Sequence, residues 1–368
     1  MKTVHLVILD LFLPKSIAAE VVAGLSLPAL QKMLGRGRSE MLEPVSIEEL
    51  LCRLFEISFQ GDAPIATISA SFDGLAAGCW LRADPVHLNL QRDQLLLAGV
   101  QVDSAEAAAL CANLNEHFSD QGMEFFAPHP QRWYVRLDTL PRIRTTPLSN
   151  VIGSDVRRAL PTGEDSARWH QLFNEIQMLL FAHPLNATRE ARGELMINSV
   201  WFWGGGCDTL LAKPADCGNS RQAAPTMLVE DTVESWGGAG PVGALKKSYA
   251  RASSDEDLVE MFATAADIPF ETLPNVWNKE ICDGEQLMVW TGLRSALRRG
   301  DLATWRDAMQ EFEAGYAQPL WQALRNGKLD LLEIDIACDD GIRHLSLKRG
   351  DTWAFWRRSR NLAEYSLV

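Results

Sequence analysis

The stretch Leu160–Gly206 decides the class of fold, and it reads LPTGEDSARWHQLFNEIQMLLFAHPLNATREARGELMINSVWFWGGG. Apolar residues at helical spacing predict a helix over 164–182, and an apolar run over 196–203 predicts a buried strand. Three glycines follow that strand directly: Gly204, Gly205 and Gly206. Glycine lets a backbone approach a ligand closely, and α/β sheets bind ligands at the carboxyl ends of their strands. The stretch therefore indicates a binding site at the edge of an α/β sheet.

Strand and helix patterns also alternate outside this stretch. Residues 4–10 form an apolar run that ends in Asp10, as expected for a buried parallel strand. The same patterns predict helices over 28–36, 46–57 and 301–326, and strands over 287–290 and 331–337. We therefore expect an α/β fold in which a mainly parallel sheet carries helices on both faces.

The middle of the chain has a different order of predicted strands and helices from the segments on either side of it. Strands are predicted over 80–90 and 94–98, a helix over 104–121, and two short strands within 123–137. This hairpin-and-helix pattern is typical of an α+β unit, so we interpret 79–192 as an inserted domain. Two core segments then remain on either side of it: 1–78 and 193–368.

Composition and charge limit the partners of the chain. Its 368 residues include 35 basic and 48 acidic side chains, and the net charge of −13 disfavours binding to nucleic acid or to an anionic membrane. No apolar run reaches the roughly 20 residues of a spanning helix, and the amino terminus lacks the cleavage site of a secretory signal. The seven cysteines are odd in number and contain no CxxC pair. We therefore expect a cytoplasmic protein with reduced cysteines.

The opening stretch resembles the archaeal-type cofactor-independent phosphoglycerate mutases of the alkaline phosphatase-like superfamily. Its matching residues are LPTG at 160–163, HPLN at 183–186, Arg189, Asn198 and WFWGGG at 201–206. The segments VILD at 7–10 and WLRADPVHL at 80–88 are similar to further parts of that family. The resemblance implies an alkaline phosphatase-like core with 79–192 as its lid. More narrowly, the whole chain is similar to the bacterial regulatory proteins of the RpfE type, which are distant relatives of those mutases.

A mutase of this family transfers a phosphoryl group through a serine that lies beside two metal ions. Two metal ions need several aspartate and histidine side chains as ligands. The resemblance implies Asp10 as one ligand, with Asp339, Asp340 and His344 as the remaining candidates. Thr67 and Ser69 are the candidate nucleophiles, but they lack the glycine and aspartate that frame the family's serine. Arginines stand near 294–299, where the family has further ligands.

The candidate ligands also have plainer interpretations. Asp10 is equally a cap for the turn that follows it. Asp339-Asp340-Gly341 is favoured as the turn of a hairpin, since Asp-Gly is a strong hairpin signal. The set would hold one divalent metal, such as Mn, Mg or Zn, and we favour the absence of any metal.

The remaining candidates point to binding. The resemblance implies Arg82, Asp84, Asn186 and Arg189, together with the three glycines, as residues that contact a small anionic or phosphorylated ligand. We therefore expect a degenerate, non-catalytic regulatory or ligand-binding homologue of the mutases. The alternative is an active metal-dependent phosphomutase or phosphohydrolase with an altered, mononuclear site. A protein partner or a homodimer is left open.

Overall fold

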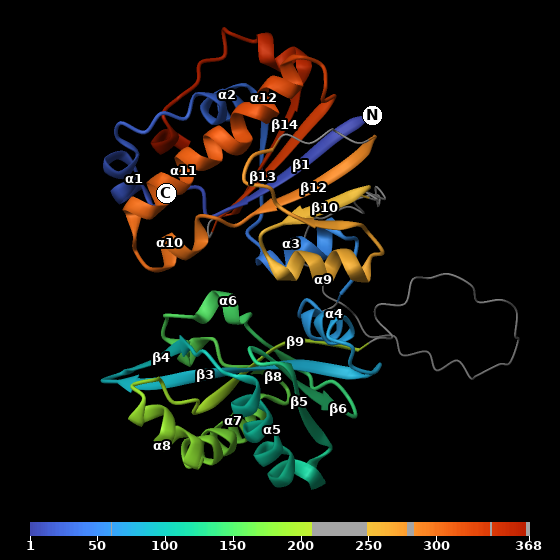
Figure 1. Ribbon diagram of the computed structural model, residues 1–368, viewed down its shortest axis with the longest axis vertical. Helices are drawn as coiled ribbons and strands as arrows, with labels where there is room; N and C mark the ends of the chain where they lie inside the picture. Colours follow the sequence, from blue (N-terminus) through green and yellow to red (C-terminus); the bar gives the residue numbers. More distant parts are fainter. Residues whose placement is uncertain (60, 208–248, 278–282, 339–340, 366–368) are drawn as a thin grey trace, which may run out of the picture.

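The computed structural model describes residues 1–59, 61–207, 249–277, 283–338 and 341–365 (Figure 1). In this part of the chain the secondary structure is built around two large sheets, which we call the main sheet and the second sheet. Figure 1 shows the main sheet with its helices in the upper half of the view and the second sheet in the lower half. The cleft described below lies between them.

The main sheet follows the order β11-β10-β12-β1-β13-β14-β2. Neighbours from β11 to β13 pair in parallel, and β14 and β2 extend the sheet in antiparallel pairing. The expected mainly parallel sheet is therefore confirmed. Its strands are β1 (Lys2–Leu9), β2 (Arg38–Leu42), β10 (Arg251–Ser254), β11 (Phe270–Thr272), β12 (Gly284–Trp290), β13 (Leu331–Cys338) and β14 (Gly341–Lys348).

Helices cover both faces of the main sheet, as expected. Side chains alternate along β1, so that Leu6 and Ile8 pack into one core cluster and Val7 and Leu9 into the other. Figure 1 shows α2, α11 and α12 on one face and α3 and α9 on the other. The helices around this sheet are α1 (Lys15–Val22), α2 (Pro28–Arg36), α3 (Ile47–Leu54), α9 (Asp257–Ala265), α10 (Arg294–Arg298), α11 (Leu302–Phe312) and α12 (Gln318–Arg325).

One buried carboxylate ties two of these helices together. A π-helical segment, Glu313–Ala317, joins α11 to α12, so the helix expected over 301–326 is continuous but not purely α. Glu313 accepts hydrogen bonds from the backbone N–H groups of Ala29 and Leu30 at 2.7 and 3.0 Å. These are orphan donors in the first turn of α2, where a negative charge is favourable. Glu313 therefore caps α2 from across the core.

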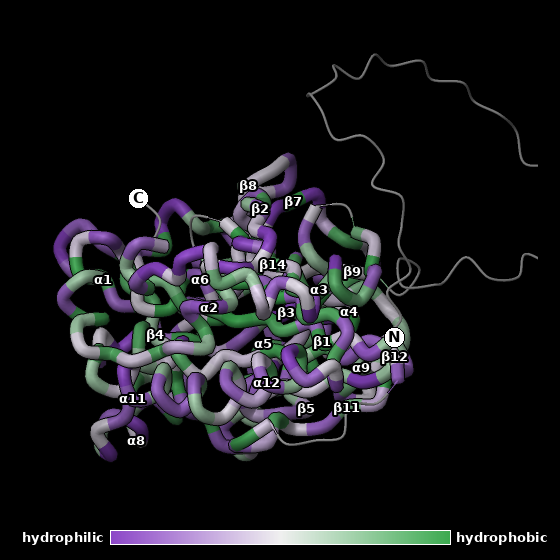
Figure 2. Tube along the Cα trace, turned by 90° about the horizontal axis from the view of Figure 1, so that it is seen from above, coloured by the Kyte–Doolittle hydropathy of each residue, from purple (hydrophilic) through white to green (hydrophobic). Residues whose placement is uncertain are grey.

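The second sheet is antiparallel and follows the order β4-β3-β6-β5, with β9 pairing with β3. Figure 1 shows α5, α7 and α8 on the side away from the main sheet, and α4 and α6 on the side facing it. Its elements are β3 (Cys79–Gln91), β4 (Gln94–Gly99), β5 (Met123–His129), β6 (Arg132–Leu137), β9 (Ser199–Cys207), α4 (Ile65–Phe72), α5 (Ser104–Phe118), α6 (Leu148–Val151), α7 (Ser166–Phe181) and α8 (Pro184–Ala191). A small antiparallel pair, β7 (Ile143–Arg144) with β8 (Thr162–Gly163), lies at the top of the view in Figure 2.

The position of β9 corrects the sequence analysis. We expected this strand in the main parallel sheet with three glycines after its end. It pairs instead with β3 in the antiparallel second sheet, and the glycines lie within the strand. The apolar run identified a buried strand correctly but carried no information about its partner, which is more than 100 residues away. The proposed domain boundaries at 79 and 193 stay predictions, and the pairing favours placing β9 with the second sheet.

The cysteines also differ from expectation. Cys79 and Cys207 lie opposite each other on β3 and β9 and form a disulfide, so the expectation of fully reduced cysteines is wrong for this pair. Cys52 and Cys111 are free, buried thiols. Burial raises the pKa of Cys52 and of Cys111 to about 12, which makes both thiols inert. Among the described residues, the structure has no helix with both the length and the apolar character that crossing a membrane requires.

Candidate functional site

A cleft of about 510 Å³ opens where β1 and β13 end, between the main sheet and the second sheet. One side of it is lined by Leu9, the last residue of β1, by Asp10 after it, and by Ala337 and Cys338 of β13. The carboxyl ends of parallel strands are the usual place for a site in an α/β fold. The remaining walls come from the start of α3, the 62–65 segment, the 145–150 segment, Trp203, Gly204 and Arg294.

Asp10 is held at the end of β1 in a strained conformation. Its φ is +58°, in the left-handed region that non-glycine residues seldom adopt, and its backbone N–H donates to the carbonyl of Ala337 at 3.0 Å. Its Oδ2 lies 3.4 Å from Nε of Arg294, the first residue of α10. Strain of this kind tends to cluster at functional sites. The carboxylate predicted from the sequence therefore lies in the cleft, paired with an arginine.

Acidic side chains dominate the rest of the cleft. Glu48 is only 2% exposed; its Oε1 accepts from Ser149 Oγ at 2.8 Å, whereas its Oε2 has no hydrogen-bond partner among the described residues. Asp62 Oδ2 accepts from the backbone N–H of Thr145 at 2.8 Å and from its hydroxyl. Burial raises the pKa of Asp62, and this effect outweighs the hydrogen bonds from Thr145. With Glu49, these residues line an acidic pocket.

The described residues of the cleft do not form the metal site that the resemblance implies. No group of three metal-ligating side chains found in the described part of the chain includes Asp10. The guanidinium of Arg294 already lies beside that carboxylate, and its charge repels a cation. Asp339 and Asp340, the other predicted aspartate ligands, lie outside the described residues; the strands that flank them, β13 and β14, pair antiparallel as the hairpin interpretation requires.

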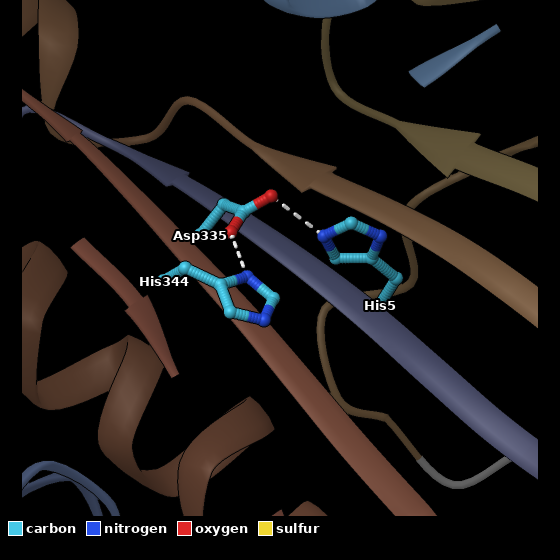
Figure 3. Close-up of side chains that lie close together, drawn as sticks. All are labelled: His5, Asp335 and His344. Carbon is cyan, nitrogen blue, oxygen red and sulfur yellow. Dashed lines mark hydrogen bonds and ion pairs between the residues drawn. The ribbon is translucent and has the colours of Figure 1, made fainter. Parts of the chain in front are cut away.

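His344 belongs to a different cluster (Figure 3). Its Nδ1 lies 2.6 Å from Asp335 Oδ1, and His5 Nε2 lies 2.7 Å from Asp335 Oδ2. Burial raises the pKa of Asp335, but the hydrogen bonds from the two histidines outweigh it and hold that pKa far below its usual value. The structure thus groups His344 with His5 and Asp335, and these three side chains form one of two possible metal-binding groups in the described residues.

Thr67 and Ser69, the candidate nucleophiles, lie on α4 and are fully buried. Ser69 Oγ donates to the carbonyl of Ile65 at 2.6 Å, a hydrogen bond within its own helix. Thr67 Oγ1 has no hydrogen-bond partner among the described residues, and it lies close to the backbone of Gly206. Neither side chain lines the cleft. A nucleophile has to reach its substrate, and these positions give neither hydroxyl that access.

Arg82 and Asp84, two predicted ligand-binding residues, form a buried network inside the second sheet. The guanidinium donates to Asp84 Oδ1 from Nε at 3.1 Å and from Nη2 at 2.7 Å. Asp84 also accepts from Trp133 N at 3.2 Å and from Trp203 Nε1 at 2.8 Å, and the Arg82 guanidinium stacks over the rings of Tyr134 and Trp203. The polar groups of this pair are therefore used to hold β3, β6 and β9 together.

Asn186 and Arg189, also predicted as ligand contacts, fix α8 to the strand segment before β9. The Asn186 amide donates to the carbonyls of Leu180 and Ile197 at 2.8 and 3.0 Å, and its oxygen accepts from Ile197 N at 2.8 Å. Arg189 Nη1 donates to Glu106 Oε2 at 2.6 Å, and its other nitrogens donate to backbone carbonyls. Both side chains are buried and lie outside the cleft lining.

Of the three glycines, only Gly204 lines the cleft. Its φ is +67°, and its N–H donates to Thr145 Oγ1 at 3.1 Å. A Cβ on Gly206 would lie 2.6 Å from Pro64 Cβ, and one on Gly205 would lie 2.9 Å from a methyl of Leu81. These glycines let protein segments pack closely on β9. Sequence reasoning recognised the close approach but assigned it to a ligand.

The residues that sequence reasoning missed are those that assemble only in three dimensions. Glu48 lies in the first turn of α3 and Asp62 lies in a short loop, so each resembles an ordinary surface acid in the sequence. Burial, rather than residue type, marks them as part of a site. Arg294 was noted in the sequence as a basic residue, and its contact with Asp10 gives it a role.

The chain was compared with known proteins. No family model matches it. It is 27% identical over 107 residues to the 2,3-bisphosphoglycerate-independent phosphoglycerate mutase of Methanosarcina mazei, and 28% identical over 108 residues to a second such mutase from Methanothermobacter thermautotrophicus. Each match covers 28% of this chain and 27% of the relative, so the alignment spans about a quarter of those mutases.

Solved structures extend the comparison over the whole chain. A cofactor-independent phosphoglycerate mutase from Thermoplasma acidophilum aligns at 13% identity with a TM-score of 0.44. A Pyrococcus horikoshii protein aligns at 12% identity with a TM-score of 0.50, covering 99% of this chain and 92% of that one. At this identity the second alignment shows the fold alone, and it agrees with the α/β architecture described above. In sequence the chain is therefore similar, over part of its length, to 2,3-bisphosphoglycerate-independent phosphoglycerate mutases.

Proposed function

We propose that this chain is a non-catalytic, phosphoglycerate-mutase-like protein that binds a small polar ligand in the cleft at the end of β1. The observation that carries this proposal is the contact between Asp10 and Arg294. Phosphoryl transfer of the mutase type needs cations beside the reacting group, and here a fixed guanidinium lies against the carboxylate that would bind the first of them.

The candidate nucleophiles support the same proposal. Thr67 and Ser69 are buried in α4 and are not among the residues that line the cleft. A covalent phosphoryl intermediate requires a hydroxyl that faces the substrate. The cleft itself is present, and the start of α3, the 145–150 segment and Arg294 contribute to its lining. A protein that retains a binding cleft without the reacting groups suits a regulatory role of the kind that the RpfE-type resemblance implies.

The lining defines the ligand more closely than the sequence did. In the described lining, Arg294 is the basic side chain that could bind an anionic or phosphorylated ligand. The same lining contains four carboxylates, which would repel such a ligand: Asp10, Glu48, Glu49 and Asp62. Glu48 Oε2 offers a buried acceptor that a donor group can satisfy. We therefore propose a ligand that joins an anionic group, held by Arg294, to an ammonium or hydroxyl group that donates to Glu48.

Turnover assays test the absence of catalysis. The purified chain is incubated with 2-phosphoglycerate, and separately with an aryl phosphate ester, in the presence of Mg²⁺, Mn²⁺ or Zn²⁺. We expect no product above the buffer rate with any of these ions. Turnover that depends on an added ion and disappears in Asp10→Asn would establish the alternative, an active metal-dependent phosphomutase or phosphohydrolase.

Thermal shift tests the binding role, because a ligand that binds only the folded state raises the melting temperature. Putrescine, inorganic phosphate and serine serve as cationic, anionic and zwitterionic probes. We expect serine to raise the melting temperature of the wild type and to lose that effect in Glu48→Gln. Glu164→Gln is the matched control, since Glu164 is exposed and is not among the residues that line the cleft. The proposed ligand chemistry is wrong if phosphate alone is effective and Glu48→Gln makes no difference.

A further inference from the structure

Three side chains on one face of the main sheet make up a cluster outside the cleft, which we call the histidine cluster: His5, Asp335 and His344. We propose that it is a binding site for one divalent transition-metal ion of the Zn²⁺ type. The proposal does not depend on the function assigned to the cleft, and Asp10 takes no part in it.

The strands position these ligands rigidly. His5, Asp335 and His344 come from β1, β13 and β14, which are neighbours in the main sheet. Asp335 is the register partner of His344 on one side and of Val7 on the other. His5 precedes Val7 by two residues, so its side chain emerges on the same face of the sheet. Figure 3 shows both imidazoles turned toward the carboxylate between them. Ligands on strands are held more precisely than ligands on loops.

The distances suit an ion. One nitrogen from each histidine and one oxygen from Asp335 all lie within 4.8 Å of one another. The two nitrogen–oxygen separations are now 2.7 and 2.6 Å. Since Zn–N and Zn–O bonds are about 2.0–2.2 Å long, neighbouring ligand atoms around a tetrahedral zinc lie about 3.3–3.6 Å apart. Each imidazole would therefore move away from the Asp335 carboxylate by about 1 Å or less to admit the ion.

The surroundings of His5 provide the partner that a metal-bound imidazole needs. When its Nε2 binds the ion, its proton must lie on Nδ1. The hydroxyl oxygen of Tyr249 lies 3.0 Å from Nδ1 and accepts that hydrogen bond, and Glu285 Oε1 lies 3.9 Å from the same nitrogen. Histidine ligands usually donate their second N–H in this way, which fixes the tautomer and orients the ring.

The ligand types favour zinc over magnesium. Two imidazoles and one carboxylate form a mixed nitrogen and oxygen set, whereas Mg²⁺ prefers oxygen ligands and retains its water. His5 and Asp335 are buried, but the His344 side chain is 25% exposed and gives the ion a route from solvent. Three protein ligands leave one position of a tetrahedron for water.

Zinc binding is measured on the purified full-length chain by equilibrium dialysis, with the bound ion counted by mass spectrometry. Co²⁺ is added separately, because its visible absorption reports ligation by nitrogen and oxygen. We expect one Zn²⁺ per chain in the wild type and binding at least about tenfold weaker in His344→Asn and in Asp335→Asn. His170→Asn is the matched control, because His170 bonds a backbone carbonyl far from the cluster. Asp10→Asn should bind zinc as the wild type does.

Chemical labelling of the wild-type protein tests the proposal without relying on variants, which can lose zinc binding simply because they misfold. Diethyl pyrocarbonate modifies exposed imidazoles, so His344 should be labelled in metal-free protein and protected by stoichiometric Zn²⁺, while His117 stays reactive. The proposal is overturned if the wild type binds no zinc, if His344→Asn binds it as tightly as the wild type, or if zinc leaves the labelling of His344 unchanged. Loss of binding in Asp10→Asn alone would place the ion in the cleft instead.

Discussion

Charged residues that resemble ligand contacts in the sequence can be needed by the fold itself, and Arg189 shows why. Its side chain is 3% exposed and donates to Glu106 and to the backbone carbonyls of Leu195 and Gln101. Glu106 in turn belongs to the capping box of α5, together with Asp103. The arginine therefore joins α5 to α8 through a buried ion pair. Removing it would leave the two carbonyls without this donor, whereas Glu106 would keep Arg192 and the backbone N–H of Asp103 as partners.

Arg189→Ala should destabilise the protein. Leaving buried acceptors without their donor costs about 1–3 kcal/mol, and the Glu106 charge keeps Arg192 as its partner at 2.7 Å. The free energy of unfolding, measured by urea denaturation at pH 7, should fall by that amount. Arg142→Ala is the control: this arginine is 72% exposed beside Glu164, and such a pair contributes about 1 kcal/mol or less. If Arg189→Ala were as stable as Arg142→Ala, the structural role would be refuted and Arg189 would again be a candidate ligand contact.

At the scale of elements, local patterns were predicted well and long-range partners were not. The helix over 28–36 agrees with α2, and the strands over 80–90 and 94–98 agree with β3 and β4 to within a residue. Those predictions rest on spacing and turn residues, which lie within the segment itself. The placement of β9 depended on which strand it meets, and no pattern within 196–206 contains that information.

The residues of the candidate site also fall into two groups, those that a local pattern predicts and those that meet only through long-range packing. Asp10 was predicted to end a buried strand at the sheet edge, and that position follows from one apolar run. Glu48, Asp62 and Arg294 come from three separate elements, so their meeting depends on the packing of the two sheets. His344 was assigned by its similarity to a family position, whereas its contacts follow from the register of β14 with β13.

The packing of α4 on β9 gives a test of the role of glycine. Gly206 has no positive φ, yet a Cβ there would lie 2.6 Å from both Pro64 Cβ and Thr67 Oγ1. Gly206→Ala should therefore force the helix and the strand apart and cost about 1–3 kcal/mol of overpacking. Gly350→Ala is the control, since no atom lies within 4 Å of its Cβ position. Denaturation curves of equal midpoint for the two variants would refute this packing argument.

At the scale of the whole molecule, the site lies between two sheets that are joined by several crossings of the chain. One hydrophobic cluster runs from Val7 and Leu9 of β1 to Leu81 of β3, so the two sheets share part of their core. The main sheet supplies Asp10 and Arg294, and the segments around the second sheet supply Asp62, Thr145 and Gly204. The shape of the cleft therefore depends on how rigidly each of the two sheets, together with its helices, positions these residues. On the second sheet, Gly204 lies near the end of β9, three residues before Cys207 of the disulfide.

The disulfide between Cys79 and Cys207 should stabilise the second sheet. It closes a segment with a sequence separation of 128, and cross-links across long segments restrict the unfolded chain most. We expect the double variant Cys79→Ser, Cys207→Ser to lose about 2–5 kcal/mol of unfolding free energy. Dithiothreitol should lower the stability of the wild type by a similar amount and leave that of the double variant unchanged.

Alkylation checks the pairing itself. The protein is unfolded in guanidinium chloride without reductant, treated with iodoacetamide, and digested. Cys52 and Cys111, which are free and buried in the folded chain, should both be alkylated after unfolding. Cys79 and Cys207 should be recovered as one linked peptide pair and become alkylated only after reduction. Equal alkylation of all four without reductant would show that the pair is reduced. The close approach of β3 and β9 would then rest on their backbone hydrogen bonds alone.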